Sequence, residues 1–476
     1  MLNLFNRAID FAFAFVMLRI LGPANAGIYY YAIVIFGWFD ILTNFGLNTL
    51  LTREVARDRS TAGRYLFNST ALRLALAALG IPLLLGFLAV RQATVSPALE
   101  GQAIAAIVLL YIGLLPGSIS TGLTALFYAF EKAEYPAAIT TVSTIVKVTL
   151  GLGTLLLGWG VVGLAGGAVI TNVVTLLVLG WLARPLAHGV FAERLDPSLL
   201  RLMVGESWPL MINHLLATVF FKIDIVLMEA INGNTVVGQY STAYKWLDAL
   251  NIIPAFLTMA LLPVMARQAR EDRAALRRNY ALAVKLLVMV ALPVAVITTF
   301  IAEPLIRVLG GAEYLPAGGI ALQIMIWSIP IGWINSVTNY VIVALDRQRT
   351  LMFAFAAGVI FNVITNLLLL PAYSYRAAAS DYHFLRRRAL RRVLPDHPPG
   401  TGRDALEAHP VASGAGSAGS AGGDAGPVAG RATGRAGARA AGVRRGAGVA
   451  APLRAGGMGA HCSPGAGPRA ALVGTA

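Results

Sequence analysis

The chain has a single cysteine, Cys462, among 476 residues, and charged residues make up only 13% of it. One cysteine excludes an internal disulfide framework and a cysteine-based metal site. The six histidines show no metal-ligand spacing, and the sequence contains no Walker motif, zinc-binding helix or Gly-x-Ser-x-Gly elbow. We therefore expect no cofactor, no metal ion and no enzymatic activity.

Long apolar runs dominate the rest of the sequence. Hydrophobic residues are 57% of the chain and the mean hydropathy is +0.69, which lies outside the range of soluble proteins. About eleven stretches approach the roughly 20 residues that cross a bilayer. They cover residues 2–21, 28–51, 66–90, 103–127, 137–157, 164–183, 208–230, 240–264, 282–301, 320–345 and 351–370. We predict an all-α, polytopic membrane protein.

Basic residues alternate between the gaps that separate these stretches. Every second gap is rich in Arg and Lys, with fifteen such residues, whereas the other gaps hold only Arg91 and Arg307. Short basic loops stay on the cytoplasmic side. We therefore predict a multi-pass protein of the cell (cytoplasmic or inner) membrane with a cytoplasmic N-terminus. The net charge of +15 then comes from loops beside anionic lipid headgroups, and we expect no nucleic-acid partner.

Two short matches indicate an internal repeat. Gly27-Ile28-Tyr29 corresponds to Gly238-Gln239-Tyr240 at an offset of 211 residues, and Val55-Ala56-Arg57 corresponds to Met265-Ala266-Arg267 at an offset of 210. An even number of helices in each repeat gives both halves the same orientation. Parallel repeats suit a transporter with two helix bundles around a central cavity.

The repeat divides the chain into four predicted parts. Residues 1–183 form a six-helix N-terminal lobe, 184–207 a cytoplasmic linker, and 208–375 a C-terminal lobe of five helices, so a twelfth helix is lost. Residues 376–476 contain no lysine and are rich in Ala, Gly, Arg and Pro. This composition is typical of disorder. It also resembles GC-rich coding DNA read in a wrong frame, so the tail is either natural low-complexity sequence or the product of a frameshift.

Seven cations lie in or at the ends of the apolar stretches: Arg7, Arg19, Arg73, Lys147, Lys222, Lys245 and Lys285. Each costs roughly 2.5–3.5 kcal/mol to insert and usually faces a cavity or a partner. We expect Lys285 and Arg73 to snorkel to the membrane surface, and for Arg19 snorkelling and function both stay open. The other four cations are the predicted substrate-binding residues, because buried cations gain most from phosphate partners.

Acidic residues in the same stretches are candidates for pairing or for ion coupling. Arg7 and Asp10 are three positions apart, so they share a helix face on which they could pair. Asp40, Asn44 and Asn48 recur every four residues. Because a polar stripe facing lipid would lack partners, we expect this one to face the bundle interior. We predict that Asp10 and Asp40 pair with cations or bind a proton or Na⁺ that drives transport.

Similar polar spacings occur on later stretches: Ser143 with Lys147, His214 with Thr218 and Lys222, Lys245 with Asp248, Asn335 with Asn339, and Asn362 with Asn366. Asp224 lies two positions beyond Lys222 and should point elsewhere. Together these stripes predict a cavity to which both halves contribute cations.

Three groups of motifs lie between residue 1 and about residue 375. The first is Arg19-Ile20-Leu21-Gly22-Pro23, Gly27-Ile28-Tyr29, Asp40, Phe45-Gly46-Leu47 and Thr52-Arg53-Glu54-Val55-Ala56-Arg57; the second is Asp224, Val237-Gly238-Gln239-Tyr240 and Ala243-Tyr244-Lys245; the third is Ala344-Leu345-Asp346-Arg347-Gln348. Together they resemble the polysaccharide transporter family, the Wzx-like oligosaccharide flippases of the multidrug/oligosaccharidyl-lipid/polysaccharide exporter superfamily. That family typically has Gly where this chain has Asp346.

The resemblance implies twelve or more helices in two six-helix lobes that open by alternating access to one membrane face and then the other. It implies that the substrate is an oligosaccharide on a polyprenyl diphosphate, flipped from the cytoplasmic to the outer leaflet for surface polysaccharide synthesis. The implied partners are membrane lipid and this lipid-linked sugar. We expect a monomer that associates with polysaccharide-assembly enzymes. No family motif defines a binding residue, so only the expectation of cavity cations for the diphosphate carries over.

Three other interpretations stay open. A multidrug or small-molecule exporter of the same superfamily is disfavoured by the cations in the cavity. A membrane-embedded polysaccharide polymerase or glycosyltransferase is disfavoured by the short outward gaps. A non-functional truncated transporter is the third, because of the abnormal tail.

Overall fold

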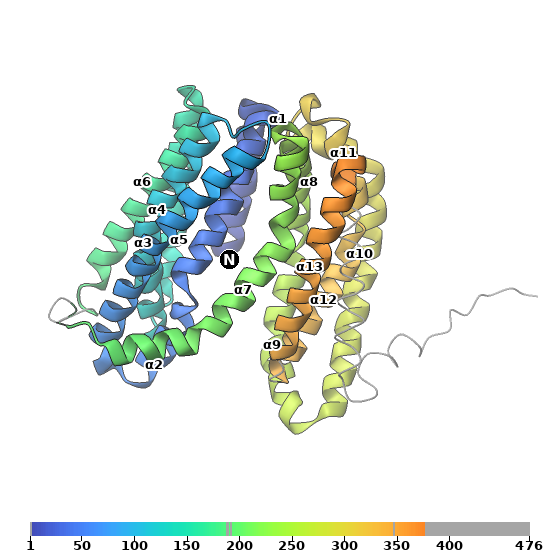
Figure 1. Ribbon diagram of the computed structural model, residues 1–476. Coiled ribbons are helices and arrows are strands. Elements are labelled where there is room, and N and C mark those ends of the chain that lie inside the picture. Colours follow the sequence, from blue (N-terminus) through green and yellow to red (C-terminus); the bar gives the residue numbers. More distant parts are fainter. Residues whose placement is uncertain (1, 187–189, 191–192, 346–347, 377–476) are drawn as a thin grey trace, which may run out of the picture. The chain divides into compact units, whose positions relative to one another are not determined.

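The computed structural model describes residues 2–186, 190, 193–345 and 348–376, and within these ranges it contains helices and no strand. The long helices are α1 (Leu2–Asn44), α2 (Leu47–Arg57), α3 (Ala62–Thr94), α4 (Gly101–Ala129), α5 (Glu134–Leu156), α6 (Gly160–Ala183), α7 (Pro197–Asn232), α8 (Asn234–Leu250), α9 (Ile252–Glu271), α10 (Arg273–Leu309), α11 (Ala317–Met325), α12 (Ser328–Ala344) and α13 (Gln348–Tyr373) (Figure 1). The short 3₁₀ turns η1 (Arg59–Thr61) and η3 (Ala312–Tyr314) lie between them. The predicted all-α fold is confirmed.

The helices have the length and the surface of membrane-spanning segments. In the described part of the chain, eight helical stretches are long and apolar enough to cross a membrane, or ten if each of two bent pairs counts as one crossing. The bent pairs are formed by α8 with α9 and by α11 with α12. Large apolar side chains such as Phe300, Leu79 and Leu368 are exposed, and lipid tails tolerate such a surface whereas water does not. The chain is a multi-pass membrane protein.

Helix α1 contains two of the predicted crossings, because the chain turns back at Gly22. Gly22 has φ 68° and ψ 172°, a conformation that favours glycine, and Pro23 follows it. Asp10 and Asp40, which are 30 residues apart on α1, lie near the same lysine of α5. Lys147 pairs with Asp10 and lines the same cavity as Asp40, so the chain must reverse its direction between the two carboxylates. A straight helix would separate these two carboxylates by roughly 45 Å. The predicted turn between the first two crossings is confirmed.

The second half of the chain begins with a similar glycine turn between two helices. Gly233 separates α7 from α8 and has φ 81° and ψ 173°, close to the values at Gly22. The Tyr244 hydroxyl donates to the Phe221 carbonyl at 3.1 Å, so α8 folds back along α7. Gly22 and Gly233 are 211 positions apart, which is the offset that the first sequence match predicts.

The repeat-equivalent glycines Gly27 and Gly238 touch each other where α1 crosses α8. A Cβ atom on Gly27 would lie 1.8 Å from the carbonyl oxygen of Asn234, and one on Gly238 would lie 1.9 Å from the carbonyl oxygen of Pro23. Pro23 and Asn234 are themselves 211 positions apart, so the contact is reciprocal, as an approximate two-fold relation requires. Only glycine allows two helix backbones to approach this closely.

The second sequence match stays a prediction. Helix α2 ends at Arg57, directly before Asp58, and α9 ends at Glu271, directly before Asp272. Both matched segments therefore lie toward the end of a helix, but α9 continues four residues past Arg267.

We call helices α1 to α6 the first half of the protein and helices α7 to α13 the second half. Within the first half α4 packs along α6, and within the second half α7 packs along α13 and α10 along α12. Helix α7 begins at Pro197, so residues 197–207 of the predicted linker are helical. The lobe boundaries stay predictions. The predicted tail beyond Arg376 and the motif residues Asp346 and Arg347 lie outside the described residues.

Candidate functional site

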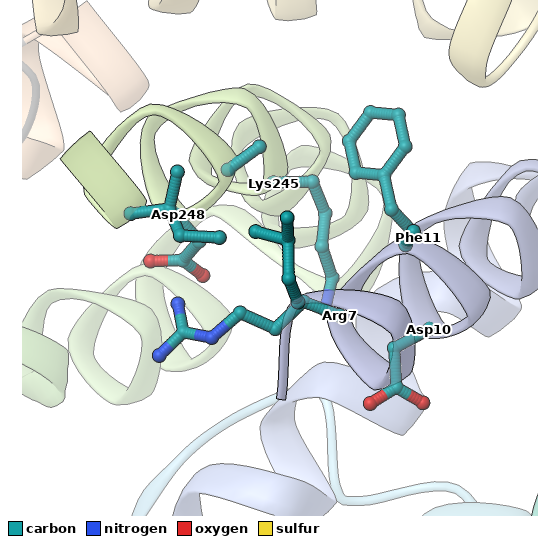
Figure 2. A pocket seen from close by; sticks show the side chains of 9 residues that line it. Arg7, Asp10, Phe11, Lys245 and Asp248 are labelled. Carbon is teal, nitrogen blue, oxygen red and sulfur yellow. The ribbon is translucent and has the colours of Figure 1, made fainter. Parts of the chain in front are cut away.

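A cavity of about 350 Å³ lies between α1 of the first half and α8 of the second half. It is lined by Leu4, Arg7, Ala8, Asp10, Phe11, Lys245, Asp248, Ala249 and Ile252. Figure 2 shows the Arg7 side chain extending from α1 toward the Asp248 carboxylate, while Lys245 extends from α8 toward α1. The cavity is within the size range of small-ligand sites, and the two halves supply opposite walls.

Two of the four cations predicted to bind substrate, Arg7 and Lys245, line this cavity. Lys147 reaches its edge through an ion pair with Asp10. Lys222 is not part of the wall, and its ammonium lies over the Tyr244 ring. The wall itself carries two cations and the two carboxylates Asp10 and Asp248, and Lys147 adds a third positive charge beside it.

Asp10 pairs with Lys147 of α5 rather than with its sequence neighbour Arg7. The Lys147 ammonium lies 2.5 Å from the Asp10 carboxylate, and both side chains are partly exposed. In Figure 2 the Asp10 and Arg7 side chains extend to different sides of α1. The Arg7–Asp10 pair suggested by their spacing is therefore wrong, and Arg7 keeps its guanidinium in the cavity.

Aromatic rings hold two of the lysine ammonium groups in place. The Lys245 ammonium lies 5.2 Å from the centre of the Tyr30 ring, and the Lys222 ammonium lies 4.0 Å from that of Tyr244. A ring face attracts a cation without neutralising it. These two charges therefore stay available to an anion while their positions are restricted.

The polar stripe of Asp40, Asn44 and Asn48, which runs from α1 into α2, faces the interior of the first half, and Arg73 of α3 organises it. Arg73 donates to the side-chain oxygens of Asn44 at 2.5 Å and Asn48 at 2.6 Å, and to the Ser118 carbonyl at 3.0 Å. Asn44 in turn donates to Asp40 at 2.8 Å. The inward orientation of the stripe is confirmed. Arg73 is fully buried, so the expectation that it snorkels is wrong; three acceptors compensate for its lost hydration.

A buried ion pair joins the two halves, and sequence reasoning missed it. Arg91, which we assigned to a gap, lies in the last turn of α3 and faces Glu229 of α7. The two side chains form a bidentate pair, with nitrogen–oxygen distances of 2.9 Å and 3.2 Å. Both are over 90% buried. The residues are 138 positions apart, so no local spacing signals their contact.

Arg19 has a structural role that resolves the open choice between snorkelling and function. Its guanidinium donates to the Val308 carbonyl at 2.8 Å and lies 4.4 Å above the Phe15 ring. Val308 is in the last turn of α10, where free carbonyls attract a cation. Nearby, the Tyr314 hydroxyl donates to the Leu18 carbonyl at 2.9 Å. These bonds tie α1 to the second half close to the glycine crossing.

Two further polar residues from the sequence patterns, Asp224 and Asn362, hold helices together. Asp224 is buried and accepts hydrogen bonds from the hydroxyls of Tyr240 at 2.6 Å and Tyr244 at 3.3 Å, so it joins α7 to α8. Asn362 of α13 donates to the Phe220 carbonyl at 3.0 Å. Among the residues that the structure describes, no group of three or more His, Cys, Asp or Glu side chains is arranged to hold a metal ion.

The fold is shared by solved transporters of low sequence identity. A structure of lipid II flippase MurJ in an inward closed conformation aligns with a TM-score of 0.68 and 14% identity, over 83% of this chain and 86% of that one. An inward-facing multidrug resistance MATE family transporter of the MOP superfamily aligns with a TM-score of 0.65 and 15% identity, over 82% and 94%. A MOP superfamily transporter from Pyrococcus furiosus aligns at 0.55 and 14%, over 82% and 91%. The chain has the MOP-superfamily transporter fold.

Family models make the assignment more specific. The model for the polysaccharide biosynthesis protein family matches residues 1–269, which is more than half of the chain, and the MatE model matches residues 209–368. A search of curated proteins returned no match. The chain belongs to the polysaccharide biosynthesis protein family, in agreement with the resemblance of its motifs.

Proposed function

We propose that this protein flips a polyprenyl-diphosphate-linked oligosaccharide from the cytoplasmic to the outer leaflet of the cell membrane. The observation that carries the proposal is the convergence of three cations from α1, α5 and α8 on the cavity between the halves. Membership of the polysaccharide biosynthesis protein family and a fold like that of a lipid II flippase support it.

The charge of the cavity selects the ligand class. Arg7 and Lys245 on the wall and Lys147 beside Asp10 offer three cations to a diphosphate, which carries two or more negative charges at neutral pH. The planar guanidinium of Arg7 suits bidentate binding of one phosphate, and the ammonium of Lys245 acts as a point charge on the other. The lipid tail stays in the bilayer, where the exposed apolar faces of the helices meet lipid.

The unequal contact between the halves provides the route for transport. They are joined near Gly22 and Gly27 of α1, whereas the cavity lies beside residues 4–11 of the same helix. A rocking motion about the joined end widens the cavity, as in other alternating-access transporters. Opening the joined end instead requires rupture of the Arg91–Glu229 pair. The basic gaps indicate that the cavity end faces the cytoplasm.

Export of a small molecule is the second candidate, because the MatE model matches most of the second half. A cationic drug would meet Arg7 and Lys245 on the cavity wall, so we rank this candidate below lipid-linked sugar. Competition separates them: in the proposed function a prenyl diphosphate inhibits transport and an organic cation does not.

The proposal is tested in proteoliposomes that contain the full chain and a fluorescent short-chain prenyl diphosphate bearing one hexose. Arg7→Ala and Lys245→Ala each remove a charged hydrogen bond of about 1.5–3 kcal/mol, so each should slow translocation at least about tenfold. Lys285→Ala is the matched control, because Lys285 is exposed on α10; its rate should equal that of the wild type. Unchanged rates in both cavity variants would refute the proposal.

A further inference from the structure

A second cavity lies inside the first half and meets the cation-lined cavity at one ion pair. Its volume is about 370 Å³, and α1, α4, α5 and α6 line it. Lys147 is part of its wall, while the partner of Lys147, Asp10, is part of the wall of the first cavity. A ligand whose phosphates lie between Arg7 and Lys245 therefore has the second cavity directly beyond the Asp10–Lys147 pair.

The wall of the second cavity is rich in hydroxyl groups, and most of their protons are already used in hydrogen bonds. Thr140, Thr144 and Thr175 donate to the backbone carbonyls four residues earlier in their own helices, at 2.7–2.9 Å. Thr121 and Thr171 do the same. A hydroxyl whose proton is occupied in this way presents its oxygen to the cavity as an acceptor.

Two other polar side chains on the wall, Ser143 and Asn172, also donate hydrogen bonds within the protein. The Ser143 and Thr175 hydroxyls lie 2.6 Å apart, and since Thr175 donates to the Thr171 carbonyl, Ser143 must be the donor between them. The Asn172 amide nitrogen donates to the Gly113 carbonyl at 2.9 Å, which leaves its side-chain oxygen as an acceptor. The cavity therefore offers many oxygen acceptors and needs a ligand that supplies several donors.

The charges in this cavity are balanced, which argues against a cation as that ligand. Asp40 receives a hydrogen bond from Asn44 and interacts with the buried Arg73, and Lys147 is paired with Asp10. Each charged group on the wall thus has an opposite partner. A neutral molecule rich in hydroxyl groups satisfies the acceptors without disturbing this balance, and the sugar ring is the common ligand with these properties.

We infer that the second cavity is the saccharide subsite of the transporter: the hexose attached to the diphosphate lies against the Ser and Thr oxygens of α4, α5 and α6. This inference rests on the proposed function, because the diphosphate between Arg7 and Lys245 brings the sugar to the subsite. It adds a saccharide specificity that the cations alone do not supply.

The test measures binding of two probes to the full chain purified in detergent: farnesyl diphosphate, and farnesyl diphosphate carrying one hexose. The wild type should bind the hexose probe at least about tenfold more tightly, since each hydrogen bond contributes roughly threefold to tenfold. The double variant Thr144→Val and Thr175→Val keeps the side-chain shape but removes two acceptors. It should lose most of the preference and keep its affinity for farnesyl diphosphate.

Thr299→Val is the matched control, because Thr299 of α10 donates to the Ala295 carbonyl in the same way at 2.8 Å. It should retain the full preference for the hexose probe. Ser143→Ala serves as a second, smaller deletion on the same wall, and should reduce the preference about threefold. Thermal unfolding of every variant establishes that it is folded before its affinity is compared.

The possible results distinguish a failure of the saccharide subsite from a failure of the proposed function. Equal wild-type affinity for both probes, or a hexose preference that survives in the double variant, would overturn the saccharide subsite and leave the proposed function intact. Failure of the wild type to bind either probe would contradict the proposed function and the subsite with it. A melting temperature that responds to Na⁺ but to neither probe would assign the second cavity to a cation instead.

Discussion

The two ends of the contact between α1 and α8 differ in almost every physical property. At Gly27 and Gly238 the helix backbones touch, and no space remains for even one additional carbon atom. At Arg7 and Lys245, a charged cavity of about 350 Å³ separates α8 from the arm of α1 that precedes Gly22. Helix α8 thus forms a tight joint with the arm of α1 that follows Gly22, and it lines an open site with the other arm. The side chains at each place determine which of the two forms.

The polar groups at the two ends also have different partners. At the joint, Arg91 is bound by Glu229 and Arg19 by the Val308 carbonyl, so protein groups satisfy both cations. At the cavity, Arg7 and Lys245 line open space. The position of a cation in a spanning helix therefore does not indicate its role. The groups that surround the cation indicate whether it holds helices together or can bind a ligand.

The largest effect should follow from filling the joint. Gly27→Ala places a Cβ atom 1.8 Å from the Asn234 carbonyl oxygen, so one backbone must move away. Overpacking of this kind costs at least about 1–3 kcal/mol, and more where the obstacle is backbone rather than a mobile side chain. We expect a clear loss of thermal stability, measured by unfolding of the purified protein in detergent, together with loss of transport.

Gly37→Ala is the control for this experiment, since it is the same substitution on the same helix at a position with no neighbour within 4 Å. Its stability should be unchanged or higher by about 0.5 kcal/mol, because alanine favours the helix. If Gly27→Ala and Gly37→Ala behave alike, the glycine joint has no structural importance and the comparison fails.

Removal of one partner from the buried ion pair should have an effect of similar size. Glu229→Ala leaves Arg91 buried without its counter-charge, which typically costs about 3–5 kcal/mol when no rearrangement relieves it. Glu206→Ala is the control, because the Arg53–Glu206 pair at 3.2 Å is exposed and should contribute less than about 1 kcal/mol. The double variant Arg91→Met and Glu229→Leu should recover most of the loss. A loss in Glu229→Ala no larger than in Glu206→Ala would mean that the pair does not join the halves.

The smallest effect concerns the surface outside the membrane, where α7 begins. Hydrogen bonds from Ser198 and Arg64 hold the pKa of Asp196 well below its ordinary value. Because the folded-state pKa is lowered, the stabilisation is complete at neutral pH and declines as the pH falls below about 4 toward the folded-state pKa. Asp196→Asn should remove this part of the acid dependence. Melting temperatures recorded from pH 7 to pH 3 measure it, and identical profiles for both proteins would contradict the prediction.

The sequence predicted the helices well because membrane crossing imposes a strong local pattern. Each predicted apolar stretch has a helical counterpart, and Gly22-Pro23 marked the first reversal. The first match of the internal repeat was also informative, because the Gly27 and Gly238 motifs form the close contact between α1 and α8. The second match did not predict the helix ends, because α9 continues past Met265-Ala266-Arg267 to Glu271 whereas α2 ends at Arg57.

Individual charges were harder to interpret, because their partners are distant in sequence. Arg91 looked like a loop residue until α3 extended past it and Glu229 met it from α7. Arg73 looked like a residue near a helix end, and its acceptors on α1 and α4 make it an interior one. Of the four predicted cations, Arg7 and Lys245 line the cavity, and their role in binding stays a prediction. The pairing of Asp10 with Lys147 depends on a packing of α1 against α5 that no local spacing encodes.

The most direct test of the account is a structure of the protein with farnesyl diphosphate bound. We predict phosphate density between the Arg7 guanidinium and the Lys245 ammonium, with the prenyl chain leaving toward lipid and the glycine joint unchanged. Density on the lipid-facing surface, or a cavity that stays empty at saturating ligand, would contradict the claim that these cations bind the diphosphate.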